Sequence, residues 1–373
     1  MKLTKIKEGK VEILIPDPKE YEINGKFDPS WAPVFYNPKM TLNRDLSVVI
    51  LNIIKPKRVI DALSATGIRG IRYYKEVGVE EVVFNDISKK AVEFINENIK
   101  INGVKGIVYN KDANSLLNEI KADFIDIDPF GSPAPFLLSA FNSAIRGGYV
   151  AITSTDLSAL VCSSKTSARR KYDLICDKLS FSRELGIRGL IGKAIREAAI
   201  LEKAVIPIFS FYHEYYYRVF FKVEGGAKKA DLLLSKLVYY YECPNCGFRD
   251  KSEYYERVTC KRCGTPMRVY GPAWDGELYD KDLVSKIKGE LSQFSYLSTF
   301  NELKKLISII EEEMKYKEPY YKLDFLSSRL KRNVPAKSKV IKCLEDASPT
   351  HFDNVGVKTD KKFDDVTNCI KIS

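Results

Sequence analysis

Short apolar runs rich in β-branched residues alternate with helical stretches between Arg58 and Asp156. This alternation predicts a parallel sheet covered by helices on both faces, which is the α/β class. The expected strands are Val59–Leu63, Val82–Asn85, Ile107–Tyr109, Phe124–Ile127 and Tyr149–Thr153. The first strand opens through Ser64–Gly70 into a helix, and the other expected helices are Lys89–Ile101, which Ser88 caps, and Pro133–Ile145.

The second half of the chain has a different pattern, which predicts an α+β module. We expect, in order, strand Tyr215–Val223, helix Ala227–Lys236, strands Leu237–Tyr241 and Met267–Trp274, and helix Lys281–Phe294. Further on, helices Phe325–Leu330 and Lys337–Leu344 with a strand at Val355–Lys358 resemble a winged helix. We place the junction near Gly225–Gly226 and expect two domains, residues 1–222 and 223–373.

The 373-residue chain carries 60 basic and 49 acidic side chains, a formal net charge of +11. This excess favours a polyanionic partner such as nucleic acid, although solubility alone could explain it. No apolar run is long enough to span a membrane, and the lysine-rich N-terminus does not resemble a signal peptide, so a cytoplasmic protein is expected. Four cysteines lack a pairing pattern and are expected to be reduced thiols: Cys162, Cys176, Cys343 and Cys369.

Acidic residues occur at the end of each of the first four predicted strands. They are Asp61, Asp86, Asp112 and Asp128. A lone aspartate after a strand is usually a turn former or helix cap. Four of them at the carboxyl edge of one parallel sheet instead indicate a ligand site, because open α/β sheets bind ligands at that edge.

The spacing of these acids suggests a nucleoside ligand. Asp86 lies 19 residues after Gly67, where a carboxylate reaches ribose hydroxyls. The first loop, DALSATGIRG, lacks the G-x-G-x-x-G pattern, which disfavours NAD. S-adenosylmethionine fits better, with Asp86 at the ribose, Asp112 and Ala113 at the adenine, and the Asp61–Arg69 loop at the methionine tail.

Two cysteine pairs, CPNC at 243–246 and CKRC at 260–263, give the spacing C-x2-C-x13-C-x2-C. Gly247 and Gly264 each follow the second cysteine, where a tight knuckle requires positive φ. Four thiolates without histidine and without an open position predict a structural zinc site. The metal ligands would be Cys243, Cys246, Cys260 and Cys263, and iron or disulfides are the alternatives.

Several motifs together resemble one family, the archaeal type of tRNA (guanine-26 N2)-dimethyltransferase, over essentially the whole chain. They are VFYNPKMTLNRDLSV (34–48), DALSATGIRG (61–70), NDIS (85–88), KDAN (111–114), DPFGSP (128–133), the paired cysteines and HFDNVGVKTD (351–360). The resemblance implies a class I methyltransferase fold, S-adenosylmethionine as donor and tRNA as substrate. It also implies donor-binding roles for Arg44, Arg69, Asp86, Asp112 and Ala113.

The segment DPFG suits methylation of an exocyclic amine. The lone pair of such a nitrogen is delocalised into the ring, so the amine must be held while it attacks. The Asp128 carboxylate and the Pro129 carbonyl can accept its two N–H bonds, and Phe130 can stack on an extruded base. Phe35 is a second candidate for that stacking surface, and inward packing is the alternative for both rings.

The remaining interpretations differ in substrate or in class. The chain could methylate another amine, such as DNA adenine or a protein glutamine, but Phe130 and Gly131 depart from the D-P-P-Y type of motif. A non-catalytic zinc protein that binds RNA would explain the charge and the cysteines and leave the four strand-end acids without a role. The sequence shows no obligate protein partner. The expected tRNA-backbone surface is the basic segment Lys322–Lys342, with a solvated face as the alternative.

Overall fold

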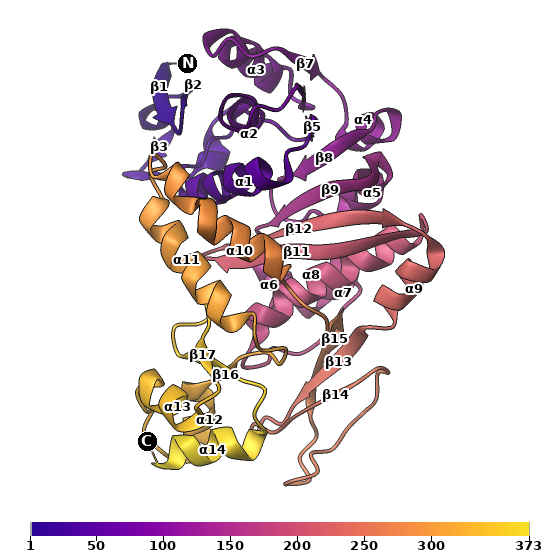
Figure 1. The fold of residues 1–373 in the computed structure, drawn as a ribbon, viewed down its shortest axis with the longest axis vertical. Coiled ribbons are helices and arrows are strands. Elements are labelled where there is room, and N and C mark those ends of the chain that lie inside the picture. The colour runs from indigo at the N-terminus through magenta and orange to yellow at the C-terminus, as the bar shows by residue number, and fades with distance from the viewer. Residues whose placement is uncertain (1, 373) are drawn as a thin grey trace. The chain divides into compact units, whose positions relative to one another are not determined.

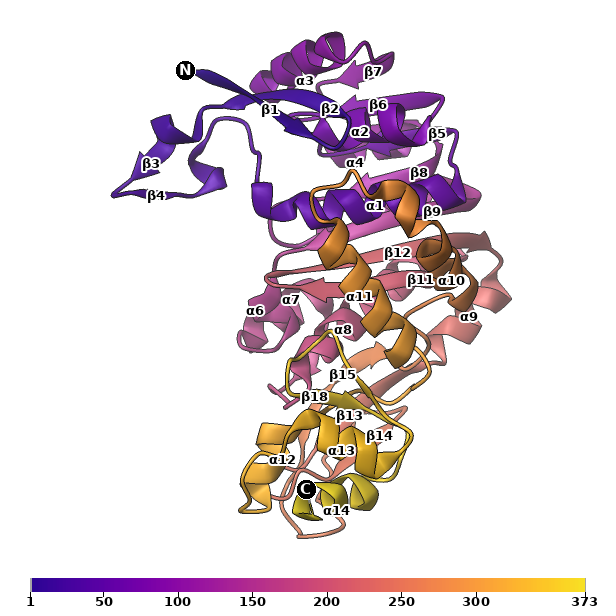
Figure 2. The same cartoon turned by 60° about the vertical axis from the view of Figure 1, so that its left-hand side comes forward.

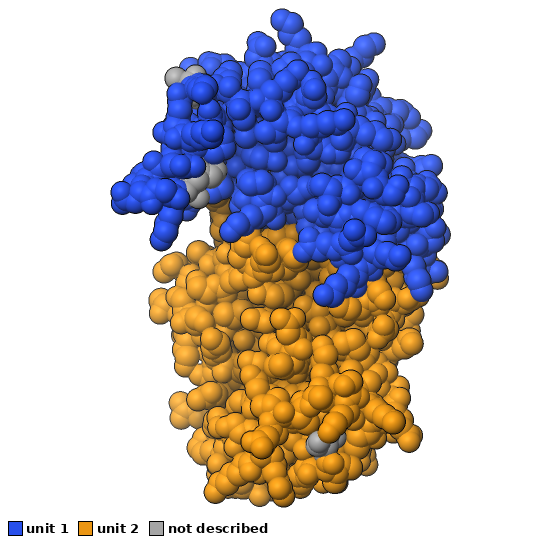
Figure 3. All heavy atoms as spheres, turned by 90° about the vertical axis from the view of Figure 1, so that its left-hand side faces the viewer, with its two compact units in different colours: residues 1–129, 136–152, 285–305 blue, residues 130–135, 153–284, 306–373 orange. Residues whose placement is uncertain are grey.

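The computed structural model describes residues 2–372, which form two compact units coloured separately in Figure 3. Unit 1 comprises residues 1–129, 136–152 and 285–305, and unit 2 comprises residues 130–135, 153–284 and 306–373. The units interleave along the chain, so their limits are not those of the predicted domains 1–222 and 223–373. A functional boundary near residue 222 stays a prediction.

Unit 1 contains a parallel sheet with strand order β9-β8-β5-β6-β7. Figure 1 labels these strands except β6, which is labelled in Figure 2. Its strands are β5 (Arg58–Asp61), β6 (Glu81–Asn85), β7 (Gly106–Tyr109), β8 (Ala122–Ile127) and β9 (Ala144–Ser154), the last two residues of β9 belonging to unit 2. The helices between them are α2 (Ile68–Arg72), α3 (Lys89–Ile101), α4 (Ala113–Glu119) and α5 (Leu137–Ser143), and α1 (Thr41–Ile54) precedes β5. The central strands are apolar on both faces, as a sheet covered by helices requires.

An N-terminal hairpin of β1 (Leu3–Glu8) and β2 (Val11–Pro16) packs on α3, as Figure 2 shows. The buried Asn98 of α3 fastens it, because its side-chain oxygen accepts the Leu14 N–H at 2.7 Å and its side-chain nitrogen donates to the Leu14 carbonyl at 3.1 Å. A smaller hairpin follows, β3 (Glu22–Ile23) with β4 (Lys26–Phe27).

Unit 2 is built around the long helix α8 (Ser182–Ala199), which packs against β11 (Lys203–His213) and β15 (Arg268–Trp274). Strand β11 forms an antiparallel hairpin with β12 (Tyr216–Gly225), and a second antiparallel sheet has the order β10-β15-β13-β14. The other strands of this second sheet are β10 (Ile175–Cys176), β13 (Leu237–Glu242) and β14 (Arg249–Ser252). Unit 2 also contains the helices α6 (Leu157–Leu160), α7 (Lys165–Tyr172) and α9 (Ala227–Leu234). Helices α10 (Lys281–Glu290) and α11 (Phe300–Glu313) follow in the chain, and residues 285–305 of these two helices and their connection belong to unit 1.

The C-terminal part of unit 2 has its own apolar core. Three helices, α12 (Leu323–Arg329), α13 (Lys337–Leu344) and α14 (Phe363–Ile372), enclose it with the small sheet β16-β18-β17. The strands are β16 (Tyr321–Lys322), β17 (Ser348–Pro349) and β18 (Gly356–Lys358). The two helices and the strand predicted for a winged helix are therefore present, and α14 is an addition.

The structure differs from the predicted elements at β9 and at β11. The helix predicted for Pro133–Ile145 ends at Ser143, and β9 starts at Ala144 rather than at Tyr149, with a register irregularity opposite Ala122 and Phe124. Strand β11 was not predicted at all. It contains Pro207, a residue that usually argues against a strand, and the register shifts at that point to accommodate it.

The expectation of four unpaired thiols was wrong. Cys162 and Cys176 form a disulfide with a Cα–Cα separation of 6.0 Å, and Cys343 and Cys369 form another at 5.7 Å. The second disulfide joins α13 to α14. Sequence spacing does not reveal such pairs, because the fold alone brings the partners together. Within residues 2–372, no helix has both the length and the apolar character to cross a membrane.

Candidate functional site

The carboxyl edge of the parallel sheet in unit 1 gathers three of the quoted motifs. Asn85, the last residue of β6, joins their loops: its side-chain nitrogen donates to the carbonyls of Ala62 and Lys111, and its side-chain oxygen accepts the Lys111 N–H, each at 3.1 Å. The segments 61–70, 85–88 and 111–114 therefore lie side by side, as their order in the sheet predicts.

Asp86 and Asp112 both make local hydrogen bonds at this edge. The carboxylate of Asp86 accepts the N–H of Ala65 in the first loop and the N–H of Ser88, each at 2.9 Å. The exposed Asp112 caps α4 by accepting the Ser115 N–H at 3.0 Å. A carboxylate has about four acceptor positions, so each retains capacity for a ligand hydroxyl.

Ala113 is the first residue of α4 and is buried. Its backbone N–H belongs to the first turn of the helix, where no intrahelical acceptor exists. It offers a single donor beside the acidic ends of β6 and β7. An adenosyl ligand requires carboxylates that accept from its ribose hydroxyls and a backbone N–H that donates to a ring nitrogen of its adenine. Asp86, Asp112 and Ala113 offer these groups and therefore fit an adenosyl ligand.

Asp61 lies beneath the first loop rather than on its surface. It is 2% exposed, and its carboxylate accepts the Gly70 N–H at 3.1 Å. Burial, assisted by the neighbouring carboxylate of Asp126, raises the pKa of Asp61 to about 7. The geometry makes Asp61 a support for the loop between β5 and α2.

Arg69 clamps the carboxylate of Asp128. It is 4% exposed, its Nη2 donates to Oδ2 of Asp128, and its Nη1 donates to Asn43 at 3.0 Å and to Ser47 at 3.3 Å. The same guanidinium lies 3.8 Å from the buried Asp126. Burial opposes the charge of Arg69, but the carboxylates of Asp128 and Asp126 raise its pKa well above the usual value.

Arg44 occupies a neighbouring buried cluster. Its Nε and Nη2 donate to the two oxygens of Glu8 at 2.7 and 2.6 Å, and Arg72 donates to both Glu8 and Asp45 at 2.8 and 2.6 Å. Burial would raise the pKa of Glu8, but Arg44 and Arg72 lower it to about 2. The structure thus engages Arg44 with Glu8, a partner that the sequence analysis missed.

The segment after β8 presents the predicted amine-holding groups. The side chain of Asp128 is 23% exposed, and Phe130 is 65% exposed, so its ring does not pack inward. Beyond Phe130, Gly131 adopts a φ of 76°, donates to Oγ1 of Thr155 and accepts the Thr155 N–H, both at 2.9 Å. Phe35 is half-buried.

The sequence analysis also missed Asp126, Asn43 and Ser47, which surround Arg69. Asp126 is fully buried and accepts the Tyr73 hydroxyl at 2.6 Å. A charged residue among the apolar positions of a central strand was the available signal for Asp126. Asn43 and Ser47 stand four residues apart on α1, so they share a helix face, but nothing in the sequence links that face to Arg69.

The four cysteines of unit 2 converge. The Sγ atoms of Cys243, Cys246, Cys260 and Cys263 all lie within 4.8 Å of one another, and none forms a disulfide. Close pairs are 3.4 to 3.8 Å apart, near the separation of about 3.8 Å that tetrahedral thiolates have around zinc. Each knuckle closes through its glycine: the N–H of Gly247 and of Gly264 donates to the carbonyl of the first cysteine, at 3.0 and 2.8 Å.

The fold and the sheet edge define a class I methyltransferase-type α/β protein, and comparison with known proteins agrees. The family model described as N2,N2-dimethylguanosine tRNA methyltransferase matches residues 9–371. The chain therefore belongs to the N2,N2-dimethylguanosine tRNA methyltransferase family.

Individual relatives are similar over their whole lengths. A tRNA (guanine(26)-N(2))-dimethyltransferase of Sulfurisphaera tokodaii is 60% identical over 100% of both chains. That of Saccharolobus solfataricus is 54% identical over 100% of this chain and 99% of its own. The structure of Trm1 from Pyrococcus horikoshii in complex with S-adenosyl-L-methionine matches with a TM-score of 0.89 and 35% identity, covering 99% of this chain and 100% of that one.

Proposed function

We propose that this chain transfers methyl groups from S-adenosylmethionine to the exocyclic N2 amine of guanine 26 in tRNA, forming N2-methylguanosine and N2,N2-dimethylguanosine. The observation that carries the proposal is the position of Asp128: its carboxylate stands at the carboxyl end of β8, held by Arg69, on the sheet edge that fits an adenosyl ligand. The family and its relatives have the same activity in their names.

The donor is assigned to the edge formed by β5, β6 and β7. Asp86 would accept from the ribose hydroxyls, and Asp112 with the Ala113 N–H would contact the adenine. Arg69 and Arg44 are the two further donor-binding residues of this proposal, and each is already paired with a carboxylate in the structure. When bound, S-adenosylmethionine supplies an electrophilic methyl group on a sulfonium sulfur.

Asp128 and Pro129 act on the target amine. Arg69 binds Oδ2 of Asp128, so Oδ1 remains to accept one amine N–H, while the Pro129 carbonyl accepts the other. Phe130 stacks on the extruded guanine. Holding the amine in attack geometry supplies much of the acceleration. The nitrogen becomes acidic only after methyl transfer, when Asp128 or water can take the proton, so a strong general base is unnecessary.

Zinc has a structural role in this proposal. Cys243, Cys246, Cys260 and Cys263 would hold one Zn²⁺ in a closed tetrahedral site between two knuckles, one at the tip of the β13–β14 hairpin and one before β15. The absence of an open position leaves no room for a catalytic water.

The test is an assay with labelled S-adenosylmethionine and unmodified tRNA, followed by nucleoside analysis. We expect both methylated guanosines from the wild type, and about a hundredfold or greater loss of turnover in Asp128→Ala with unchanged donor binding by calorimetry. The matched control is Asp231→Asn on the exposed face of α9, which removes a charge far along the chain from this segment. Retained turnover in Asp128→Ala would refute the amine-holding role. Methylation of DNA or protein instead of tRNA would refute the substrate.

A further inference from the structure

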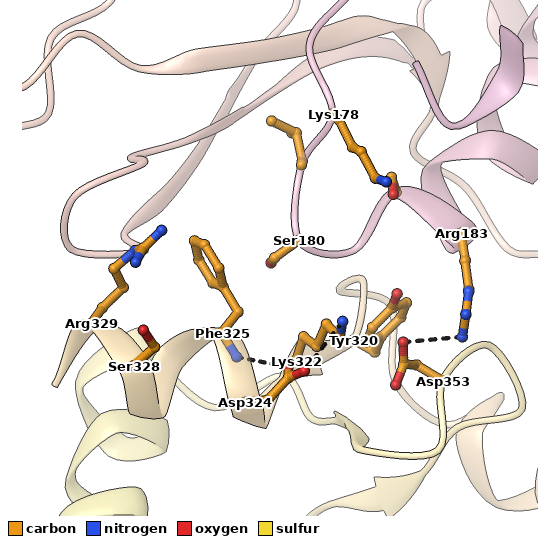
Figure 4. Close-up of a pocket in the computed structure, with 12 residues that line it drawn as sticks. Lys178, Ser180, Arg183, Tyr320, Lys322, Asp324, Phe325, Ser328, Arg329 and Asp353 are labelled. Atoms are coloured by element: carbon orange, nitrogen blue, oxygen red, sulfur yellow. Dashed lines mark hydrogen bonds and ion pairs between the residues drawn. The ribbon is translucent and has the colours of Figure 1, made fainter. Parts of the chain in front are cut away.

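Unit 2 contains a pocket of about 400 Å³ that has no part in the site described above. One wall is the segment 178–183, which leads from β10 into α8, and the other is β16 with α12 (Figure 4). Figure 4 shows Lys178 and Ser180 on the first wall and Phe325 and Arg329 on the second. Pockets that bind small organic groups span about 300 to 1,000 Å³, so this one could accept a nucleotide.

The charges around the pocket favour an anion. Four basic side chains line it against two acids. Arg183 pairs with Asp353 at 3.2 Å, and Lys322 pairs with Asp324 at 3.3 Å. The two other cations, Lys178 and Arg329, are exposed and have no acidic partner within 4 Å among the residues described.

The second wall also offers a surface for a planar group. The guanidinium of Arg329 lies 4.8 Å from the centroid of the Phe325 ring, and Phe325 is only half-buried. Aromatic rings and arginine planes are the surfaces on which unpaired RNA bases stack. The hydroxyls of Ser180 and Ser328 add hydrogen-bonding groups nearby.

Arg249 fastens the two walls together, so the pocket is preformed. Its Nη2 donates to the Ser180 hydroxyl at 3.0 Å, and its Nη1 donates to the Tyr320 carbonyl at 2.8 Å. The buried Glu242 completes the brace by accepting the Ser180 N–H at 2.7 Å and the Arg249 Nε–H at 3.3 Å. A preformed site loses little conformational entropy when a ligand binds.

We propose that this pocket binds one unpaired nucleotide of the substrate RNA, distinct from the target guanine. Lys178 and Arg329 bind its phosphate, and its base stacks on Phe325. The exposed position of both cations suits a polyanion that continues beyond the pocket, whereas the polar and charged lining disfavours an apolar ligand. The proposal rests on tRNA being the substrate of the chain.

The test compares two double variants that lose the same charge. Lys178→Gln with Arg329→Gln removes the phosphate contacts. Lys228→Gln with Lys304→Gln removes two exposed cations from α9 and α11 and is the control. Affinity for unmodified tRNA is measured by filter binding over a range of salt concentrations, and melting curves confirm that both variants fold.

The pocket variant should bind tRNA about tenfold more weakly than the control at low salt. The slope of log affinity against log salt should fall by about 1 to 2, because each lost phosphate contact reduces it by about 1. The KM for tRNA should rise while kcat stays the same. Phe325→Leu should weaken binding by about fivefold with an unchanged salt slope, because stacking is lost and charge is kept.

Equal affinities and slopes in the pocket variant and the control would overturn the inference. A second outcome would also overturn it. If the wild type bound guanosine monophosphate or inorganic phosphate, and the pocket variant lost that binding but kept the tRNA affinity of the control, the pocket would serve a free anion. Failure of the proposed function is a separate result: the wild type itself would transfer no methyl group to tRNA.

Discussion

Replacing the buried carboxylate of Asp61 should remove part of the pH dependence of the free energy of unfolding. Asp61 is 2% exposed, and burial together with the Asp126 carboxylate raises its pKa from 3.8 to about 7. The folded protein therefore binds this proton more tightly than the unfolded chain does. Below about pH 4 both states are protonated, and the stabilising contribution is complete; it is lost as the pH rises through 7.

The magnitude follows from the size of the pKa difference. About three units at 1.36 kcal/mol per unit correspond to about 4 kcal/mol between pH 4 and pH 8. The variant Asp61→Asn cannot ionise, and its side-chain oxygen can still accept the Gly70 N–H. The free energy of unfolding of the variant, minus that of the wild type, should therefore increase by about 4 kcal/mol over this range.

Urea unfolding followed by circular dichroism, without methyl donor and at pH intervals between 4 and 8, measures this difference. Asp231→Asn on the exposed face of α9 is the control, because it removes a carboxylate that is not buried. Its stability should follow that of the wild type. A constant difference between Asp61→Asn and the wild type at every pH would refute the reasoning, since it would mean that the folded state binds no additional proton at this position.

Three further predictions concern the clamp, the cysteine cluster and the second disulfide. Arg69→Met should lower the free energy of unfolding, measured in urea titrations, by about 3 to 5 kcal/mol, because it leaves the buried Asp126 carboxylate without its cation. The kcat of this variant should also fall, because Asp128 loses the guanidinium that holds it. An unchanged free energy of unfolding together with an unchanged kcat would show that Arg69 holds neither carboxylate in place. Cys246→Ser should reduce the zinc content measured by atomic absorption and lower the melting temperature, while the affinity for the methyl donor stays the same. If the wild-type protein contained no zinc, the prediction of a structural zinc site would be wrong. The double variant Cys343→Ser with Cys369→Ser should be about 3 to 4 kcal/mol less stable than the wild type, which is the loop-closure value for a separation of 26 residues. If an alkylating agent modified every cysteine of the unfolded, unreduced wild type, the disulfide would be excluded.

Local pattern predicted the elements whose burial repeats with a regular period. Helix α3 has the predicted bounds Lys89–Ile101 and the predicted cap, since the Ser88 hydroxyl accepts the Ala91 N–H. Strands β5 to β8 lie within two residues of their predicted starts and ends. The four-cysteine cluster was predictable too, because two C-x2-C knuckles are local structures whose spacing suits a single metal.

Strand β11 escaped prediction because its local signal and its tertiary role conflict. Pro207 cannot donate a hydrogen bond to a neighbouring strand, but the pairing with β12 shifts register at that residue and continues to His213. A long antiparallel partner thus overrides a single unfavourable residue. Such a partner is not visible in the pattern of the segment itself.

The sequence alone determined the sheet class, the row of acids at its carboxyl edge, the two cysteine pairs that form one cluster, and the resemblance to a family. These features depend on residues close together in the chain or on the rule that parallel strands end at one edge. Only the tertiary structure decided that Arg69 clamps Asp128, that Arg44 pairs with Glu8, and which cysteines form disulfides. Those contacts join residues 14 to 59 positions apart, and their partners are selected by the packing of the core, which brings distant side chains within bonding distance.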